Sequence, residues 1–598
     1  DRFVLSAGHG SALLYATMLL SKYESITIED LKKFRQLNSR CPGHPENHVL
    51  EGVEVATGPL GQGIAMGVGL AIAETKLAAM FNTYGKLVDH HTYVLFGDGC
   101  LQEGVALEAI ALAGKLKLNK LIMLYDSNNI QLDGPVSNCS NVDVKKLFKA
   151  NGWNYFKVRN AENTYDISTA IKLAKAGAFG ARPTVIECKT TIGFGSRFQN
   201  TNTVHGSPLN EDQMNELRAN LHYKNPVFTI DPLVFHDMDA LSVRGTKHQI
   251  HFNKALNNLE IKNIELYHRF VAIINNKFNF QYDWYSTLNN HEAATRTIVN
   301  KVLQPILENN PTYFATSADL FASCLVKANN SANFAHNNKL GQNIEYGVRE
   351  FAMVAINNGI NAHGGLKTFG STFLSFSDYC KGAIRLAAIS QIPTINIFTH
   401  DTITVGEDGP THQPIEQIWS LRLIPNHHVF RPFNDVECVQ SLALALSQPT
   451  TPSTIICSRG TFINQQTNLD DAKNGAYVVY ENEQANLTII ATGSEVAIAL
   501  ELVEILKQEA INIRVVSAPC LSIFEQQAQA YKDKVLGTLP KISIEFGVTT
   551  PWYQYVDYAI GINEFGKSGK PKDVVEHFNL STNKIAQSIK NWYTNKSR

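Results

Sequence analysis

The stretch that most constrains the fold runs from Tyr93 to Gly134. It opens with a short apolar run, residues 93–96, which predicts a buried strand. A segment with the apolar positions of a helix follows over about 103–118, and a second apolar run at 121–125 predicts another strand. A strand, a helix and a strand form a βαβ unit, whose right-handed crossover makes the two strands parallel. The chain is therefore expected to build parallel α/β sheets.

Polar residues stand at the carboxyl ends of both predicted strands. Asp98 lies in a Gly-Asp-Gly sequence after the first strand, and Asn128 follows the second. Ligands of parallel sheets bind outside these ends, so the fold can bring the two side chains together. A tight Asp-Gly turn would explain Gly-Asp-Gly alone, but the paired asparagine favours a binding site. Asp98, Asn128 and the Ile130 carbonyl form an all-oxygen set that suits Mg²⁺ or Ca²⁺ and leaves room for a diphosphate and water.

Gly-Asp-Gly, a spacer of a little under thirty residues and an Asn-containing turn resemble the thiamine diphosphate motif. The surrounding letters resemble transketolase, and the resemblance covers essentially the whole chain. It rests on these further segments: SAGHG (6–10), CPGHPE (41–46), GPLGQG (58–63), VHG (204–206), SADL (317–320), IEYGVREFAM (344–353) and GEDGPTHQP (406–414).

The resemblance implies three α/β domains, each with a largely parallel sheet between helices. They are a diphosphate- and metal-binding domain at 1–275, a pyrimidine-binding domain at 276–465 and a C-terminal α/β domain at 466–598. Residues from about 209 to 290 are polar, with a helix-like part near 254–278, and are expected to end the first domain and form a linker. Related transketolases carry some tens of residues before the position of Asp1, so the first domain is expected to be incomplete at its N-terminus, where any targeting segment would lie.

Composition excludes several classes of partner. The 598 residues carry a net charge of −1, so no overall field recruits nucleic acid or a membrane. No run of 18 consecutive apolar residues is present, so no membrane-spanning helix is expected. Nine scattered cysteines without a Cys-x-x-Cys pair favour unpaired thiols, a reducing compartment and a cytoplasmic location.

The resemblance gives three histidines a functional interpretation. Alone, His9, His44 and His205 would be ordinary turn or loop residues. The resemblance implies that the first two face the reacting carbon, and that His205 contacts the diphosphate and substrate. Histidine suits proton transfer near neutral pH, so these three are expected to bind cofactor or substrate and to take part in catalysis.

The glycine-rich segment 58–63 is neither a GxGxxG sequence nor a P-loop. It could be a flexible loop before a helix expected at 64–79. The resemblance implies instead that it lies under the thiazolium ring and the diphosphate, with Leu60 as a wedge that bends the cofactor. The residues expected to bind cofactor in this domain, apart from the histidines and Asn128, are Gly58, Pro59, Leu60, Gly99, Glu103 and Ile192. Ile192 follows a strand predicted at 183–188.

Glu103 and Glu108 are five positions apart and so do not share one helical stripe. A solvated helix face is the simple interpretation. The resemblance implies that they line a subunit interface near the cofactor and that one or both join a carboxylate relay.

Glu350 is the second expected catalytic centre. It falls in an apolar segment that predicts a helix, and burying a bare acid there would be costly. A salt bridge to Arg349 is one explanation, but adjacent helix positions point apart. The resemblance implies that Glu350 shares a proton with the pyrimidine nitrogen of thiamine diphosphate, which leads to the cofactor's C2 carbanion.

Aromatic residues follow in the same domain. Phe373, Phe376 and Tyr379 have the spacing of one helical stripe, for which core packing is the default explanation. The resemblance implies a platform for the aminopyrimidine, with Phe376 stacking on it. It also places Asp319 near the cofactor.

The segment GEDGPTHQP is the most specific substrate signal. The resemblance implies that Asp408 accepts a hydrogen bond from a sugar hydroxyl, and that His412 donates to a developing oxyanion or a hydroxyl. Residues expected to hold a substrate phosphate are Arg296, Ser323, His400 and Arg459. Thr404 and Gly460 depart from the glycine and glutamine usual in the family, which bears on sugar preference.

The last block, 486–598, predicts strands at 487–490, 513–516 and 542–544. Its ATGSE segment (491–495) could bind an anion at a helix start. It contains no recognisable acid–base cluster, so a role in assembly is expected.

These observations predict a ketol transferase of the transketolase type. It would move a two-carbon unit from a ketose phosphate to an aldose phosphate, with thiamine diphosphate and Mg²⁺ (or Ca²⁺ or Mn²⁺). The family forms homodimers with sites at the subunit interface. The alternatives are dihydroxyacetone synthase, with formaldehyde as acceptor, a non-catalytic relative and, with a poorer fit, deoxyxylulose-phosphate synthase.

Overall fold

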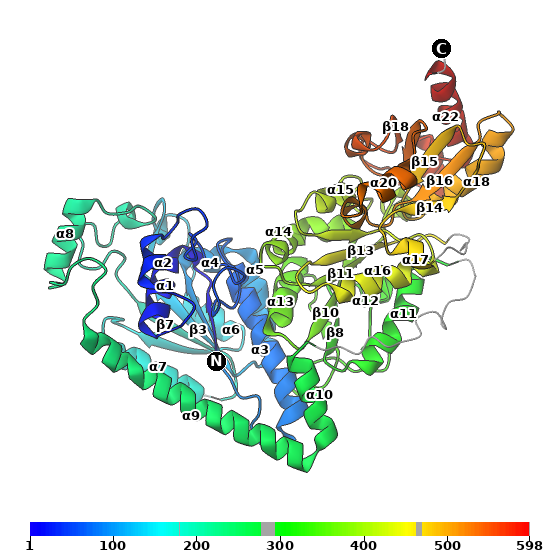
Figure 1. Cartoon of the computed structure of the whole chain (residues 1–598). Coiled ribbons are helices and arrows are strands. Elements are labelled where there is room, and N and C mark those ends of the chain that lie inside the picture. The colour runs from blue at the N-terminus through cyan, green and yellow to red at the C-terminus, as the bar shows by residue number, and fades with distance from the viewer. Residues whose placement is uncertain (179, 277–292, 462–468, 597–598) are drawn as a thin grey trace. The chain divides into compact units, whose positions relative to one another are not determined.

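The computed structural model of the chain describes residues 1–178, 180–276, 293–461 and 469–596. They form two compact units, which are described separately (Figure 1). The first unit comprises Asp1–Phe278, Phe334–Gly341 and Ala355–Leu366, and the second comprises Asn279–Asn333, Gln342–Val354 and Lys367–Arg598.

The first unit is built on a five-stranded parallel sheet. Its strand order is β1 (Arg2–Leu5), β2 (Thr92–Gly97), β3 (Leu121–Ser127), β7 (Thr184–Lys189) and β6 (Asn154–Val158). The strands predicted at 93–96, 121–125 and 183–188 are confirmed; the first two are each longer by two residues, and the third is shifted by one residue. A small antiparallel pair, β4 (Ile130–Gln131) and β5 (Gly134–Pro135), follows β3.

Helices around this sheet include α1 (Ser11–Leu20), α3 (Gln62–Phe81), α4 (Asp98–Gln102), α5 (Gly104–Leu116), α6 (Val144–Ala150) and α7 (Thr164–Lys175). The helix α3 packs against α5 and β2. Within the part of the chain that the structure describes, Gln62–Tyr84 is long and apolar enough to cross a membrane by length and composition alone. Its most apolar stretch is 78% buried within the protein, as expected of a core helix.

The first unit also contains a close helix crossing. The helix α13 (Glu350–His363) continues from the second unit into the first, where it meets α3. A Cβ on Gly69 would collide with the Ile356 carbonyl oxygen, and one on Gly359 would come within 2.7 Å of the Met66 Cα. The glycines thus let two backbones approach more closely than any side chain would permit.

The region expected to be a polar linker is largely helical. It contains α8 (Glu211–Asn220), α9 (Pro232–Lys262) and α10 (Ile264–Ile274). The linker prediction is wrong because Leu259, Phe270 and Ile273 are buried, and the Phe270 ring packs edge-on against Phe81 with centroids 5.1 Å apart. The end of the helix predicted near 254–278 and the expected domain start near His291 lie outside the described residues.

The second unit holds two further sheets. The order of the first is β12 (His428–Phe430), β13 (Ser453–Cys457), β11 (Ile395–Thr399), β10 (Lys367–Phe373), β8 (Tyr313–Ser317) and β9 (Asn343–Glu345), all parallel. Helices of this domain include α11 (Thr295–Asn309), α14 (Ser377–Ile389) and α16 (Asp435–Ser447). Its strands are buried along almost their whole length, as is typical of a sheet with both faces covered.

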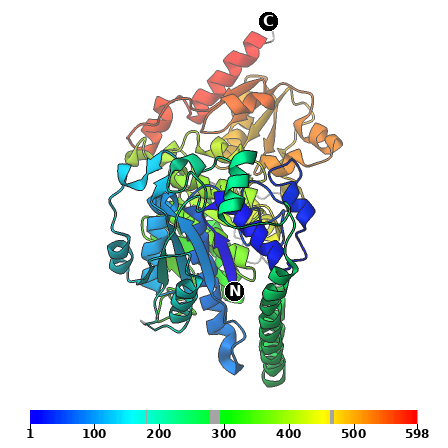
Figure 2. The same cartoon turned by 90° about the vertical axis from the view of Figure 1, so that its left-hand side faces the viewer.

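The order of the third sheet is β14 (Tyr477–Tyr480), β16 (Ile513–Ser517), β15 (Leu487–Ala491), β17 (Lys541–Ile544) and β18 (Tyr558–Ile560). Only β14 is antiparallel to its neighbour. The helix α22 (Thr582–Lys596) closes the chain (Figure 2). The three strands predicted here and the fold class, three largely parallel α/β sheets, are confirmed. The domain boundaries at 275/276 and 465/466 stay predictions.

The crossing of α3 and α13 generates a stability prediction. Gly69→Ala should lower the free energy of unfolding by about 1–3 kcal/mol, because the new Cβ overpacks the interface. The matched control is Gly245→Ala inside α9, where a Cβ meets nothing within 4 Å. That control should be neutral or stabilising by up to about 1 kcal/mol through helix propensity. Urea unfolding measures both, and equal behaviour of the two variants would contradict the prediction.

Candidate active site

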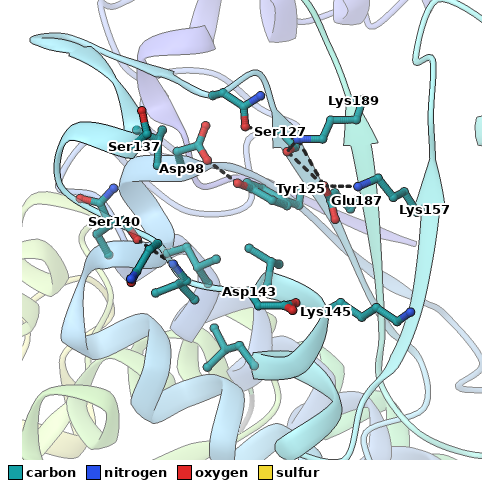
Figure 3. A pocket seen from close by; sticks show the side chains of 18 of the residues that line it. Asp98, Tyr125, Ser127, Ser137, Ser140, Asp143, Lys145, Lys157, Glu187 and Lys189 are labelled. Carbon is teal, nitrogen blue, oxygen red and sulfur yellow. Dashed lines mark hydrogen bonds and ion pairs between the residues drawn. The ribbon is translucent and has the colours of Figure 1, made fainter.

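The structure places Asp98 and Asn128 at one edge of the first sheet. β2 and β3 pair so that Gly97 lies opposite Asp126. Asp98 directly follows Gly97, and Asn128 follows shortly after Asp126. Asp98 is the first residue of the short helix α4. The Tyr125 hydroxyl donates to Asp98 Oδ1 (Figure 3). Burial raises the pKa of Asp98, although the Tyr125 hydrogen bond and the nearby Asn129 amide favour its charged form.

The second oxygen of Asp98 fits a cation. Oδ2 is buried and has no hydrogen-bond partner among the described residues. Asn128 Oδ1 accepts from the Ile130 amide at 2.9 Å, which closes a tight turn at the end of β3. In the described part of the chain no cluster of three His, Cys, Asp or Glu side chains could hold a metal, so a cation here needs amide or backbone oxygens as well.

Three expected histidines lie near one another. The His9 and His205 ring centroids are 5.2 Å apart. Burial lowers the pKa of His9, as do neighbouring His205 and His44, and burial lowers the pKa of His44. A Cβ on Gly58, whose φ is +146°, would lie 3.3 Å from the His44 ring. Neutral imidazoles beside a glycine turn can accept or donate a proton at an adjacent ligand.

The glycine-rich loop 58–63 reaches the same edge. A Cβ on Gly99 would lie 2.9 Å from Leu60 Cδ1, and one on Gly61 would lie 2.6 Å from Glu103 Cβ. Leu60, Gly99 and Glu103 are therefore neighbours, as the resemblance implied. Glu103 is exposed as the residue preceding α5, Glu108 is partly buried on that helix, and Pro59 is exposed. The Ile192 carbonyl accepts from the Asn200 amide at 3.0 Å.

Sequence reasoning missed a charged network beside Asp98. Glu187 Oε1 lies 3.2 Å from Lys157 Nζ and 3.4 Å from Lys189 Nζ, and Lys189 donates to Ser127 Oγ at 2.7 Å. These side chains line a cavity of about 1310 Å³ that also reaches Asp98 and Tyr125 (Figure 3). The signal was available in principle, because Ser127 and Lys189 are register partners at the carboxyl ends of adjacent parallel strands.

In the second unit, the aromatic segment differs from the expected single helix. Phe373 ends β10, Phe376 lies in the 3₁₀ turn Leu374–Phe376, and Tyr379 lies in α14. The prediction of one stripe is wrong because β10 extends to Phe373. The rings nevertheless form a row, with centroids 5.9 Å apart for Phe373 and Phe376 and 6.2 Å for Phe376 and Tyr379.

Two expected substrate histidines adjoin these rings. His400 lies 3.8 Å from Phe373, and His412 lies 5.2 Å from Phe376, centroid to centroid. His400 Nδ1 lies within hydrogen-bond distance of Thr399 Oγ1, at 2.8 Å. Burial lowers the pKa of His400 to about 3, with further lowering by the positive charges of Arg296 and Arg459.

Arg296 and Arg459 lie close enough for their positive charges to interact. Burial and the charge of Arg459 lower the pKa of Arg296. Arg296 Nη1 donates to the Ser323 carbonyl at 2.6 Å, and Arg459 Nη1 donates to the Val405 carbonyl at 3.1 Å. Neither guanidinium pairs with a carboxylate in the described ranges, and Arg296 Nε is buried without a partner. Such a pair beside His400 is suited to an anion.

The GEDGPTHQP loop is held by the third domain. Gly409, with φ +76°, packs so closely on Ser568 that a Cβ would collide with its hydroxyl, and Gln413 Nε2 donates to the Lys567 carbonyl at 2.9 Å. Asp408 is exposed in this loop, and Thr411 Oγ1 lies 2.9 Å from His412 Nδ1. The third domain therefore shapes the expected substrate loop, a role that the sequence did not reveal.

The two departures from the family lie side by side. A Cβ on Gly460 would be 3.9 Å from Thr404 Oγ1. Thr404 Oγ1 in turn lies 2.7 Å from Thr402 Oγ1. Gly460, which lacks the glutamine side chain usual in the family, therefore borders the Thr404 hydroxyl, which the usual glycine would lack.

Glu350 is not in a helix interior, as the sequence suggested, but is the first residue of α13. It is 8% exposed, and its charge contributes, after burial, to raising the pKa of Cys380. A carboxylate in the first turn is favoured by the helix dipole, which helps to explain an acid at a buried position. Asp319 follows β8 in a left-handed conformation, with φ +64°.

Comparisons with known proteins decide the family. The family models described as "Transketolase, thiamine diphosphate binding domain", "Transketolase, pyrimidine binding domain" and "Transketolase-like TK C-terminal domain" match residues 1–279, 291–463 and 475–581. A transketolase of Halalkalibacterium halodurans is 40% identical over 614 residues, covering 100% of this chain and 91% of its own. A probable transketolase of Streptococcus pneumoniae is 39% identical over 604 residues, covering 99% and 91%.

The chain belongs to the transketolase family. Transketolase from Leishmania mexicana superposes with a TM-score of 0.95 at 39% identity, covering 98% of this chain and 88% of its own. The Pichia stipitis transketolase in complex with sedoheptulose 7-phosphate gives 0.96 at 37% identity, covering 100% and 90%. The prediction of a transketolase-type transferase with thiamine diphosphate-binding domains is confirmed, and neither dihydroxyacetone synthase nor a non-catalytic protein is favoured.

The environment of Asp98 generates a pH prediction. Its raised pKa means that the folded protein retains a proton to higher pH than the unfolded chain. The associated stability is fully present below the unfolded pKa and is lost as pH rises through the folded pKa. In ligand-free protein, Asp98→Asn should therefore gain stability relative to wild type as pH rises above about 4.

Asp143→Asn is the control, because it lies on the same cavity and its pKa is lowered by the Lys146 amide. Because that pKa is lowered, the stability contributed by the charged Asp143 is already present above about pH 4 and is lost only in more acidic solution. The stability of Asp143→Asn relative to wild type should therefore stay nearly constant from about pH 4 to about pH 8. Thermal unfolding between pH 4 and pH 8 measures both. If the stabilities of the two variants relative to wild type changed with pH in the same way, the raised pKa of Asp98 would be contradicted.

Proposed function

We propose that the chain transfers a two-carbon ketol unit from a ketose phosphate such as xylulose 5-phosphate to an aldose phosphate such as ribose 5-phosphate or erythrose 4-phosphate. The observation that carries the proposal is the Arg296–Arg459 pair beside His400, which has no carboxylate partner in the described ranges. A substrate phosphate would supply the missing charge. The proposal places the enzyme in the cytoplasm and in the pentose phosphate pathway.

The first unit would bind Mg²⁺ and the diphosphate of the cofactor. Asp98 Oδ2, the Asn128 side chain and the Ile130 carbonyl are the proposed ligands, and Ca²⁺ or Mn²⁺ could take the same oxygen set. Gly58 and Gly99 have no side chains, so their backbones could approach the cofactor closely, and Leu60, which packs on Gly99, would serve as the wedge. When bound, thiamine diphosphate supplies a carbon nucleophile for the ketose carbonyl.

The second unit would hold the aminopyrimidine. Glu350 would hold a proton at the ring nitrogen that faces it, and its burial keeps water from competing. The row of Phe373, Phe376 and Tyr379 offers faces on which a flat ring can stack in an offset arrangement. Asp319, at the end of β8, would border the same ring.

Histidines would move protons on the sugar. His9, His44 and His205 are held together in the first unit, where burial keeps His9 and His44 neutral near pH 7. They would accept or donate protons at the sugar hydroxyls and at the carbonyl oxygen. In the second unit, Asp408 and His412 would bind hydroxyls of the sugar chain. Arg296, Ser323, His400 and Arg459 would hold its phosphate.

A homodimer would join the two halves of the site. The proposed diphosphate and pyrimidine residues belong to different compact units. In a two-fold dimer, the first unit of one subunit and the second unit of its partner would form one site, and the symmetry would create two. Glu103 and Glu108 would lie near this interface and join a carboxylate relay.

A substrate assay tests the proposal. Purified protein should convert xylulose 5-phosphate and ribose 5-phosphate to a seven-carbon ketose phosphate and a three-carbon aldose phosphate. Activity should require both thiamine diphosphate and Mg²⁺, and chelation should abolish it reversibly. Faster turnover with formaldehyde as acceptor, or no turnover with any sugar phosphate, would overturn the proposal.

Glu350→Gln tests the role of the buried acid. The amide cannot ionise and so cannot share a proton with the pyrimidine nitrogen, and kcat should therefore fall by about 10²–10⁴-fold. The matched control is Glu345→Gln, because Glu345 is exposed five residues earlier. Circular dichroism and thermal unfolding should show both variants folded. Wild-type turnover by Glu350→Gln would remove the acid from the mechanism.

A further inference from the structure

Arg431 lies at the centre of a buried charge cluster in the second unit. It follows β12 and is fully buried. Its Nη2 donates to Asp401 Oδ2 at 2.8 Å, and its Nη1 donates to the Thr492 carbonyl at 3.0 Å and hydroxyl at 2.9 Å. Glu495 also forms an ion pair with Nη1. One planar guanidinium therefore connects the second sheet, through Asp401, with the third domain.

The third-domain partners come from the ATGSE segment, which by its sequence could bind an anion. The structure shows a different occupant, because the start of α18 (Glu495–Lys507) surrounds the Arg431 side chain. The Gly493 amide donates to the Arg431 carbonyl at 3.0 Å, and a Cβ on Gly493 would lie 2.8 Å from Arg431 Nε. Gly493, with φ +55°, is thus required by the close approach of the arginine.

Glu545 extends the cluster within the last block. Arg422 makes two contacts of 2.9 Å with its carboxylate, and Trp552 Nε1 donates to it at 3.0 Å. The Thr492 hydroxyl donates to the same carboxylate at 2.5 Å. Burial raises the pKa of Glu495, whereas Arg422 and Arg431 lower the pKa of Glu545 against the effect of its burial.

Asp401 directly follows His400, the residue beside the cationic pair. β11 ends at Thr399, and His400 then adopts a left-handed conformation with φ +64°. A residue other than glycine keeps this conformation only when its surroundings hold it there. On one side, Thr399 is fixed by pairing with Phe373 and Cys457. On the other side, the described contact that fixes the Asp401 side chain is Arg431.

We propose that Arg431 is a positioning residue, which through Asp401 fixes the backbone turn that aims His400 at the substrate phosphate. The third domain thereby contributes to phosphate recognition without touching the substrate. The inference rests on the proposed function, because His400 matters in this way only if a sugar phosphate binds beside it.

The test uses two mild substitutions in the full-length enzyme. Asp401→Asn keeps the shape of the side chain but removes its charge, and Arg431→Lys keeps the charge but cannot reach Asp401, Thr492 and Glu495 together. We expect each to raise KM for xylulose 5-phosphate by about five- to tenfold, with kcat little changed, because binding is weakened before and during the reaction alike. The kcat/KM for D-xylulose, the same donor without its phosphate, should stay at the wild-type value.

Glu437→Gln is the matched control. Glu437 is equally buried on α16 and accepts from Phe433, Tyr477 and Ser517, again joining the third domain to the second sheet. It makes no described contact with Asp401 or His400. Its substitution should change thermal stability while leaving both donors' kinetics unchanged, which separates positioning from general stability.

A double-mutant cycle completes the test. Once His400 is replaced in His400→Ala, adding Asp401→Asn should cause little further rise in KM. Additive effects, equal losses with both donors, or unchanged KM in Asp401→Asn and Arg431→Lys would overturn the inference. If either variant fails to fold, Glu495→Gln removes another ion pair of Arg431 and should likewise raise KM for xylulose 5-phosphate but not change kcat/KM for D-xylulose. A wild-type enzyme inactive with sugar phosphates would instead refute the proposed function.

Discussion

Parallel strand pairing is the constraint on which the rest of this structure depends. In a parallel sheet all strands end at the same edge, so residues that follow different strands meet in space. In the first unit, the pairing of Gly97 with Asp126 sets Asp98 beside the Asn128 turn. In the second unit, Phe373, Thr399 and Cys457 lie in one row across three strands, and His400 and Arg459 follow from the ends of two of them.

Buried charge is the second organising feature. Each expected functional region contains a polar group that the described fold leaves incompletely satisfied, such as Asp98 Oδ2 and Arg296 Nε. A buried polar group without a partner is costly, and these two lie where the proposed metal and substrate phosphate would supply the missing partner. The cluster around Arg431 has a different character, because its guanidinium meets three carboxylates inside the protein. It serves to join domains, and its one link to the substrate region runs through Asp401.

The third domain illustrates how assembly and specificity can be combined. Sequence reasoning gave it only an assembly role, since its own sheet carries no substrate motif. The structure nevertheless packs Ser568 and Lys567 against the GEDGPTHQP loop. Gly409 accepts the contact with Ser568 because its backbone adopts a positive φ angle and it has no side chain to displace the neighbouring segment.

The sequence by itself determined the three α/β sheets, the edge residues Asp98 and Asn128, and the family, because strand patterns and motif letters are local properties. It failed where local patterns compete with packing. The spacing of Phe373, Phe376 and Tyr379 fits a helix, but Phe373 belongs to the strand β10 and the three cannot share one helix. The polar segment after residue 209 folds because a few apolar residues, such as Phe270, pack against residues elsewhere in the chain. Only the tertiary structure decided that ATGSE holds Arg431, because the choice between an external anion and an internal cation depends on which distant side chain is brought within reach.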